Sequence, residues 1–187
     1  MALVGFNPQF HTGAATLYLK VEPRRPYDEL HAEAERLRWL PGRLPVPALC
    51  YTGADDLHSY QLTVAVPGVD ATDDGLRAEP AQLVKVLAER LRRIHRQSIA
   101  GCPFDQRLDA ELARATANVV IEGWALSGFI DLGRCGVADR YHDLAQAERS
   151  VRRNLGARWV GPFFAAYGIG TPNAVKLHYY QLLDELF

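Results

Sequence analysis

The sequence predicts an α+β fold, in which a strand-rich first part with one helix precedes a mainly helical part with one hairpin. Residues 17–21 alternate apolar and polar side chains, which is the period of a half-buried strand. Residues 80–95 repeat apolar side chains at helical spacing. Two short apolar runs, Asn118–Glu122 and Ala125–Ile130, flank Gly123-Trp124 and predict a hairpin.

The first part of the chain contains the predicted strands. We expect a loose start over residues 1–13, a strand over 14–21, and a helix capped by Asp28 that ends at Pro41-Gly42. An extended segment over 44–50 and a strand over 59–66 follow.

The second part is dominated by predicted helices. Pro80 suits the first position of the helix over 80–95. After the hairpin, further helices are expected from Asp139, around 159–167, and from Thr171-Pro172 to the C-terminal end. We therefore place a lobe boundary at 66/67, which gives residues 1–66 and 67–187.

Composition restricts the class of protein. The 187 residues carry 21 basic and 22 acidic side chains, so no large basic excess supports nucleic-acid binding. No apolar run is long enough for a membrane helix, and no signal peptide is evident. The three cysteines are widely spaced, which favours a reducing cytoplasm over a disulfide framework or a zinc site.

Lys20 and Glu33 form the first pair with two interpretations. Glu33 lies at the edge of the apolar stripe of its helix, where a carboxylate needs a charged partner. Lys20, one of only three lysines, stands on the preceding strand. The pair either presents an ammonium group to a phosphate, or consists of a rim glutamate and a lysine that reaches water.

Asn118 and Asp131 form the second pair. A hairpin turn near 123–125 brings them together at its open end, where carboxylate and amide oxygens suit Mg²⁺. The alternative is a turn-forming aspartate and a strand-capping asparagine. Asp139 and Asp143 are interpreted as helix-start residues, His95 as a hydrogen-bonded core histidine and His142 as exposed.

Several ordered segments resemble the aminoglycoside 3'-phosphotransferases. The segments are LYLKV (17–21), EAERLRWL (33–40), RLPVP (43–47), AVPGVDA (65–71), LRRIH (91–95), CPFD (102–105), SGFIDLGRCGVADRYHDLA (127–145), ERS (148–150) and YYQLLDELF (179–187). The resemblance implies a protein-kinase-like fold of two lobes, a truncated N-lobe sheet with one helix, and a mainly helical C-lobe with a hairpin. It also implies transfer of the γ-phosphoryl group of ATP to an antibiotic hydroxyl.

The resemblance assigns nucleotide and metal roles residue by residue. Lys20 matches the lysine that holds the α- and β-phosphates, and Glu33 matches its helix partner. The segment 63–66, with Thr63 and Ala65, matches the hinge that receives adenine. Asn118 and Asp131 match the two residues that hold Mg²⁺.

The resemblance also implies a substrate site for a small polycation. Arg134 and Arg149 match positions near the phosphate and the substrate. Asp184, Glu185 and the carboxylate of Phe187 match the acidic end that receives the aminoglycoside.

Two departures from the family pattern bear on activity. The family carries a His-Gly-Asp motif just before the asparagine, whose aspartate accepts the proton of the attacking hydroxyl, but this chain contains no His-x-Asp triplet. The helical segment before that motif and the phosphate-covering loop also lack counterparts. We expect activity to be weak or lost, and the affected lobe to be less stable or to expose a self-association surface.

Two functions are therefore consistent with this sequence. The first is an ATP-dependent aminoglycoside phosphotransferase with residual activity, in which Asp105 or Asp109 replaces the missing base. The alternative, which we favour for this chain, is a non-catalytic kinase-like protein that binds nucleotide, aminoglycoside or a partner chain.

Overall fold

The computed structural model describes residues 9–12, 15–25, 28–105, 118–133 and 135–185 of the chain. For residues 9–12, 118 and 185 it describes the backbone only.

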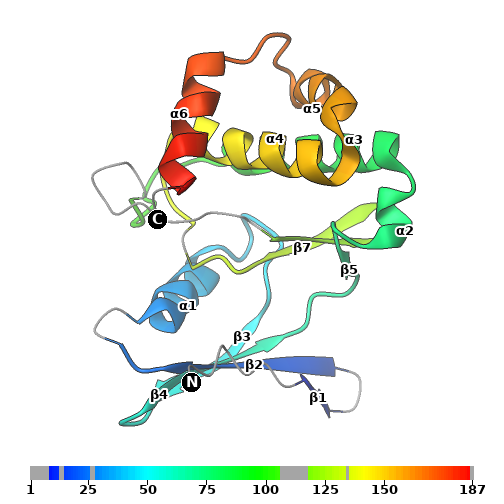
Figure 1. Ribbon diagram of the computed structural model, residues 1–187. Helices are drawn as coiled ribbons and strands as arrows, with labels where there is room; N and C mark the ends of the chain where they lie inside the picture. Colours follow the sequence, from blue (N-terminus) through cyan, green and yellow to red (C-terminus); the bar gives the residue numbers. More distant parts are fainter. Residues whose placement is uncertain (1–8, 13–14, 26–27, 106–117, 134, 186–187) are drawn as a thin grey trace.

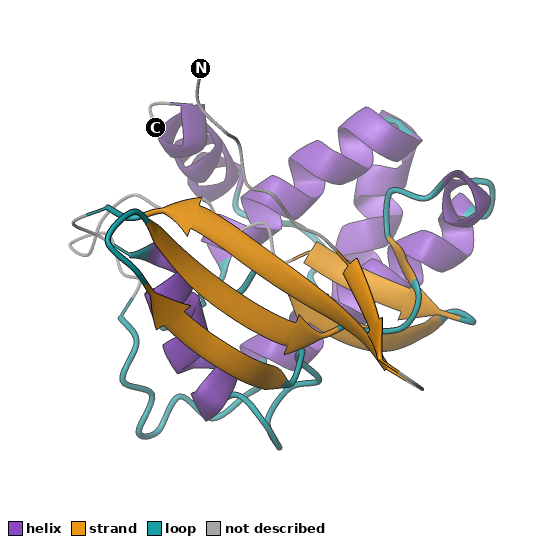
Figure 2. Ribbon diagram, turned by 90° about the horizontal axis from the view of Figure 1, so that it is seen from below, coloured by secondary structure: helices purple, strands orange, loops and turns teal. Residues whose placement is uncertain are grey.

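A four-stranded antiparallel sheet forms the first part of the fold (Figure 1). Its strands are β1 (Gln9–Thr12), β2 (Ala15–Pro23), β3 (Leu49–Ala54) and β4 (His58–Val64), in the order β1-β2-β4-β3. Alternate residues of β4 are buried, as expected for a strand with one covered face. Seen from below, this sheet faces the viewer and the helices lie behind it (Figure 2).

Helix α1 (Glu29–Trp39) lies between the strands β2 and β3 in the chain and contacts β3 and β4. Asp28 caps it, because its Oδ1 accepts a hydrogen bond from the His31 amide at 3.0 Å. Its buried face contains leucine and alanine together with two charged side chains, Glu33 and Arg36. Both charged side chains need partners, because burial removes their hydration.

A second sheet has the order β5-β6-β7, with β5 (Val69–Asp70), β6 (Asn118–Glu122) and β7 (Ala125–Ile130). Gly123 and Trp124, which join β6 and β7, both have positive φ angles of 53° and 63°. A two-residue turn of this kind matches the right-handed twist of the strands, so the predicted hairpin is confirmed.

The remaining helices lie beside the second sheet, on the side away from the first (Figure 1). They are α2 (Asp74–Arg77), α3 (Pro80–His95), α4 (Tyr141–Leu155), α5 (Val160–Tyr167) and α6 (Ala174–Glu185), with a short 3₁₀ turn over Ala157–Trp159. Their core is centred on Val84, Leu144 and Phe163. Among the described helices, none has the length and apolarity that crossing a bilayer requires.

A separate apolar cluster joins the two parts of the chain. Leu37, Leu40 and Leu44 pack with Phe129 and Leu132, all 6% exposed or less. This cluster fixes α1 against the end of the β6–β7 hairpin. The lobe boundary at 66/67 stays a prediction.

The observed fold is α+β, as predicted, with local differences. Residues 9–12 form β1 instead of a loose start, and the rest of 1–13 lies outside the described residues. The short elements α2 and β5 were not predicted. α4 begins at Tyr141, whose amide donates to the Asp139 carboxylate at 3.0 Å, so Asp139 stands one residue before the cap.

Candidate functional site

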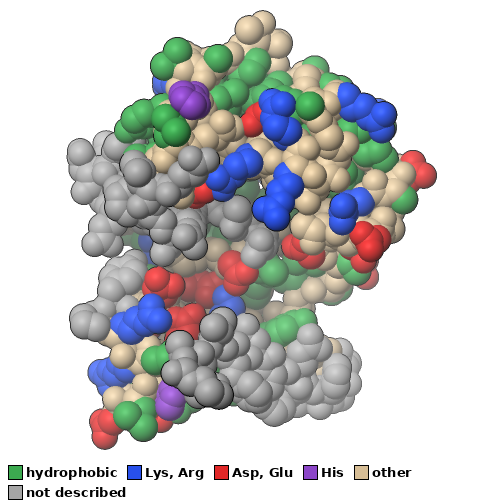
Figure 3. Space-filling model, viewed as in Figure 1, with side chains coloured by type: hydrophobic (Ala, Val, Ile, Leu, Met, Phe, Trp, Pro, Cys, Tyr) green, Lys and Arg blue, Asp and Glu red, His purple; other side chains and the backbone are tan. Residues whose placement is uncertain are grey.

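Lys20, Glu33 and Asp131 meet where the two parts of the fold face each other. Lys20 on β2 donates to Glu33 Oε2 at 2.8 Å and Oε1 at 3.1 Å, and to Asp131 Oδ1 at 2.6 Å. The Glu33 side chain is 7% exposed, while those of Lys20 and Asp131 are 26% and 48% exposed. Figure 3 shows acidic and basic side chains gathered at this level of the molecule. The geometry supports the ion-pair interpretation of Lys20 and Glu33 over the water-reaching one.

The surrounding carboxylates control the charge of Lys20. Burial lowers the pKa of the Lys20 ammonium, but the charges of Glu33 and Asp131 outweigh burial, so the net shift is upward. Burial and the nearby Glu29 raise the pKa of Glu22 on the same strand. A positively charged Lys20 with its tip partly open can bind a phosphate oxygen as a point charge.

The loop after β7 is held in place by α1. Asp131 has a φ angle of 55°, a left-handed conformation that aspartate tolerates better than most residues. The next amide, of Leu132, donates to Glu33 Oε1 at 3.1 Å. A Cβ atom on Gly133 would contact the Glu33 Cβ at 3.7 Å. Glu33 thus positions both the lysine and the loop that carries Asp131.

The donor set around Asp131 suits a hard cation. The hairpin register pairs Asn118 with Ile130, so the backbone of Asn118 lies beside the residue that precedes Asp131. Among the described residues, no group of three or more acidic, histidine or cysteine side chains forms a cation site. Mg²⁺ in phosphate-binding sites commonly takes one or two protein ligands and completes its shell with phosphate and water. Asp131 therefore fits Mg²⁺ that arrives with a nucleotide.

The predicted hinge, residues 63–66, begins in the last two residues of β4 and continues beyond it. Thr63 is 8% exposed and pairs with Tyr18 and Leu49 on either side. The Ala65 amide donates to the Thr16 carbonyl at 2.8 Å, so this amide already has a partner.

The predicted substrate residues are described only in part. Arg149 on α4 forms an ion pair with Asp184 on α6, and also donates to Gln146 Oε1 at 2.8 Å. The Asp184 side chain is 12% exposed and that of Arg149 is 44% exposed. The side chain of Glu185 and the whole of Arg134 and Phe187 lie outside the described residues.

A partly buried polar network lies near the site and confirms the interpretation of His95 as a hydrogen-bonded histidine. His95 Nε2 lies 2.9 Å from Asp143 Oδ2, and His95 Nδ1 lies 2.8 Å from the Tyr167 hydroxyl. Burial raises the pKa of Asp143, but hydrogen bonds from His142 and His95 outweigh it and lower the pKa overall. His142 is half-buried beside Asp143, so its expected exposure was wrong. The sequence indicated His95, at the end of an apolar helix face, but not its pairing with Asp143 and Tyr167.

The site contains a strand lysine that is held by a helix glutamate and that lies opposite an aspartate following a hairpin. With this arrangement, the protein has the fold of a kinase-like phosphotransferase. The model of the phosphotransferase enzyme family APH matches residues 7–119 and 115–178. The chain belongs to this family.

Individual relatives support the assignment. An aminoglycoside 3'-phosphotransferase from Niallia circulans is 32% identical over 91% of this chain and 83% of its own length. The crystal structure of an aminoglycoside 3'-phosphotransferase of type VIII covers all of this chain with a TM-score of 0.84, at 26% identity and over 91% of its own chain. An aminoglycoside phosphotransferase from Streptomyces rimosus, determined with ADP and streptomycin, shares the fold at 22% identity, with a TM-score of 0.76 over 95% of this chain and 92% of its own.

The matches also show that this chain has fewer residues than its relatives within the aligned region. The alignment with the Niallia circulans protein runs over 218 positions, whereas 91% of 187 residues is about 170, so about 48 positions have no residue here. The two pieces of the family match overlap at 115–119. A match that splits at this point is expected if family positions are missing there, which agrees with the predicted shortening before Asn118.

Proposed function

We propose that this chain binds Mg-ATP between Lys20 and Asp131 and an aminoglycoside near Asp184, and that it transfers phosphoryl groups slowly or not at all. The observation that carries the proposal is the intact contact of Lys20 with both Glu33 and Asp131. This arrangement sets a cation and a metal-binding carboxylate side by side, as phosphoryl transfer requires.

Each group at the nucleotide end has a defined role. Lys20 would bind phosphate oxygens, and Glu33 would keep its ammonium group charged and oriented. Asp131 and Asn118 would hold Mg²⁺, which when bound neutralises phosphate charge. Adenine would lie at the hinge. The Ala65 amide there already has a backbone partner, whereas no backbone partner is described for the next amide, that of Val66, which could therefore donate to the base.

Slow transfer follows from the missing base. A positioned general base contributes roughly 10²- to 10⁴-fold to rate. Because the chain contains no His-x-Asp triplet, the hydroxyl of a bound substrate lacks the family's proton acceptor. Positioning and charge stabilisation at Lys20 and Asp131 would remain.

The substrate end must accept a polycation. Asp184 supplies negative charge, but the Arg149 guanidinium already neutralises it. An aminoglycoside ammonium group would compete with Arg149 for this carboxylate. We therefore expect weak binding at this end, with an affinity that falls as salt is added.

The test combines turnover and binding. ATP consumption is measured with kanamycin and Mg²⁺, and thermal unfolding is measured with and without Mg-ADP. Lys20→Met and Asp131→Asn should each remove the stabilisation by Mg-ADP. Asp56→Asn is the matched control, because Asp56 is exposed in the β3–β4 turn. If Mg-ADP leaves the unfolding temperature of the unmodified chain unchanged, the nucleotide-binding proposal is wrong.

The same data separate the active and non-catalytic forms of the proposal. Kanamycin-dependent ATP consumption that disappears in Asp131→Asn would establish an active enzyme. Asp105→Asn and Asp109→Asn would then identify a substitute base. Stabilisation by Mg-ADP without turnover would establish a binding protein, the form favoured by the absent motif.

Self-association and location stay predictions. Self-association was predicted through surface exposed by the missing segments; Val175, Tyr179 and Leu182 recur on one face of α6 and are 79%, 44% and 47% exposed, and we infer that this face is a candidate for it. Light scattering over a range of concentrations checks it, and a monomer throughout would contradict it. We infer a cytoplasmic location from the three free cysteines and from the use of ATP.

A further inference from the structure

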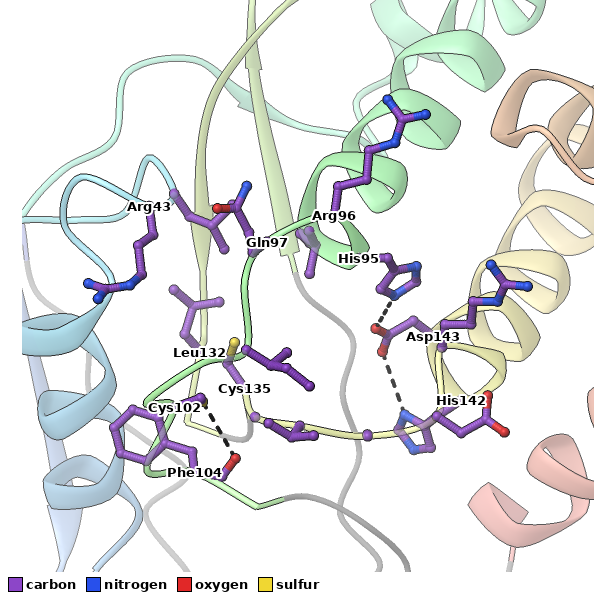
Figure 4. A pocket seen from close by; sticks show the side chains of 18 of the residues that line it. Arg43, His95, Arg96, Gln97, Cys102, Phe104, Leu132, Cys135, His142 and Asp143 are labelled. Atoms are coloured by element: carbon purple, nitrogen blue, oxygen red, sulfur yellow. Dashed lines mark hydrogen bonds and ion pairs between the residues drawn. The ribbon is translucent and has the colours of Figure 1, made fainter.

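A cavity of about 600 Å³ lies behind the nucleotide end, between α1 and the start of α4. Figure 4 shows Leu132, Cys135, Cys102 and Phe104 along one side of it, and His95 and Asp143 along the other. The residues assigned to nucleotide on β2 and β4 do not line it. Cavities of this size with mostly apolar walls are typical of small-molecule sites.

Arg36 on α1 is the unusual lining residue. It is 5% exposed, although it carries a full charge. Its Nε donates to the Cys135 carbonyl at 2.7 Å and its Nη1 to the Ala32 carbonyl at 2.8 Å. Its guanidinium lies over the Phe104 ring, 4.7 Å from the centroid. These contacts fix the plane of the guanidinium group but supply no negative charge.

The third nitrogen of Arg36 has no such contact. Among the described residues, Nη2 of Arg36 makes no hydrogen bond. It is also not one of the fully buried polar atoms that have no hydrogen-bond partner, so it keeps some accessible surface. Because Arg36 is almost entirely buried and lines the cavity, the cavity is where Nη2 reaches open space.

The carboxylates of the cavity are already paired elsewhere. Asp131 contacts Lys20, Asp143 contacts His95, and Asp139 contacts Lys176 at 2.7 Å. None of them forms an ion pair with Arg36 in the part of the chain that the structure describes. A buried cation with a free donor and no counter-charge favours an anion from outside.

We propose that this cavity binds a small aromatic carboxylate, with the carboxylate on Arg36 and the ring against Phe104 and Trp39. Trp39 and Phe104 stand edge to face with centroids 6.0 Å apart and offer an aromatic wall beside Arg36. The cavity shares Asp131 with the nucleotide end, but the three residues proposed to bind the carboxylate and its ring, Arg36, Trp39 and Phe104, have no role in the proposed function.

The experiment uses 2-naphthoate and its neutral counterpart 2-naphthamide, titrated into the full chain by calorimetry. The two probes share the ring and differ in charge. A hydrogen bond to a charged group is expected to strengthen binding roughly tenfold to a hundredfold, so 2-naphthoate should bind tighter than 2-naphthamide by that factor. Saturating Mg-ADP should leave this binding unchanged.

Two arginine variants separate the site from general surface charge. Arg36→Lys should weaken 2-naphthoate binding at least tenfold, since lysine cannot reproduce the fixed fork. Arg38→Ala is the control: Arg38 lies on the same helix as Arg36, but it is exposed and does not line the cavity. Arg38→Ala should bind 2-naphthoate as the unmodified chain does.

The proposal does not depend on the folding of the variants, because the probe pair is compared on the unmodified chain. Equal affinities for the two probes, or no binding of 2-naphthoate at millimolar concentration, would overturn the proposal. Displacement of 2-naphthoate by Mg-ADP would assign the probe to the nucleotide end and would also overturn it.

Discussion

Replacing Glu33 with alanine should destabilise the protein by about 2 kcal/mol at pH 7. The variant loses two hydrogen bonds donated by the Lys20 ammonium and one donated by the Leu132 amide. Removing one partner of a fully buried pair costs about 3–5 kcal/mol. Lys20 keeps Asp131 and is 26% exposed, so we expect a cost below this range, about 2 kcal/mol. For a chain of this size, about 2 kcal/mol corresponds to a fall of about 4–8 °C in unfolding temperature.

The pH dependence of this effect follows from Lys20. Its pKa is raised above the ordinary value of 10.5 in the folded protein. Its contribution to stability is therefore complete below pH 10.5 and disappears as the pH rises through the higher folded pKa. The difference between the unmodified chain and Glu33→Ala should be constant from about pH 6 to 9 and shrink above about pH 10.5.

Urea unfolding followed by tryptophan fluorescence measures this difference, with Glu35→Ala as the control. Glu35 lies on the same helix but is exposed, and its contact with His31 is 3.8 Å long, so its removal should have no measurable effect. A double-mutant cycle with Lys20→Met and Glu33→Leu isolates the pair. If the two single effects simply add, Lys20 and Glu33 do not stabilise each other and the reasoning fails.

Three further results are expected. Asp143→Asn should lower the free energy of unfolding by about 1–3 kcal/mol at pH 7. Because the pKa of Asp143 is lowered by its histidine partners, the difference in urea unfolding between this variant and the unmodified chain should vanish as the pH falls below about 3.8. A difference that stays constant with pH would contradict this assignment. Arg149→Ala should strengthen kanamycin binding several-fold, because it frees the Asp184 carboxylate, whereas Asp184→Asn should weaken the binding. Calorimetry measures both affinities, and an unchanged affinity in both variants would place the antibiotic elsewhere. Burial raises the pKa of the Cys135 thiol to about 11, so only about 10⁻³ of it is thiolate at pH 8, and iodoacetamide labelling followed by mass spectrometry should modify the exposed Cys50 well before Cys135.

The elements that sequence predicted best are those with a strong local pattern. Helix α3 has apolar side chains on one face and Pro80 at its start, and the Gly123-Trp124 turn is bounded by two apolar runs. Short elements such as α2 and β5 were missed. β5 consists of two residues whose pairing with β6 depends on a strand about 50 residues away.

The roles of the candidate site residues could be predicted from the sequence only through the family resemblance. Local reasoning left the Lys20–Glu33 pair with two interpretations, because the third member, Asp131, is 111 residues away from Lys20 in sequence. The role of Arg36 was not predicted either. A helix pattern can indicate that a residue faces inward, but it does not show that Arg36 lines a cavity whose carboxylates, among the described residues, are paired with other cations.

The Leu132 amide proton has an unusual hydrogen-bond partner, the Glu33 side chain. This amide is bound to a side chain of α1 and not to a neighbouring strand or turn. It can exchange with solvent only when α1 and the Asp131 loop separate. Hydrogen exchange at Leu132 would therefore report how often the protein takes its lysine and its metal-binding aspartate apart, and a nucleotide that bridges the two groups would slow that single proton.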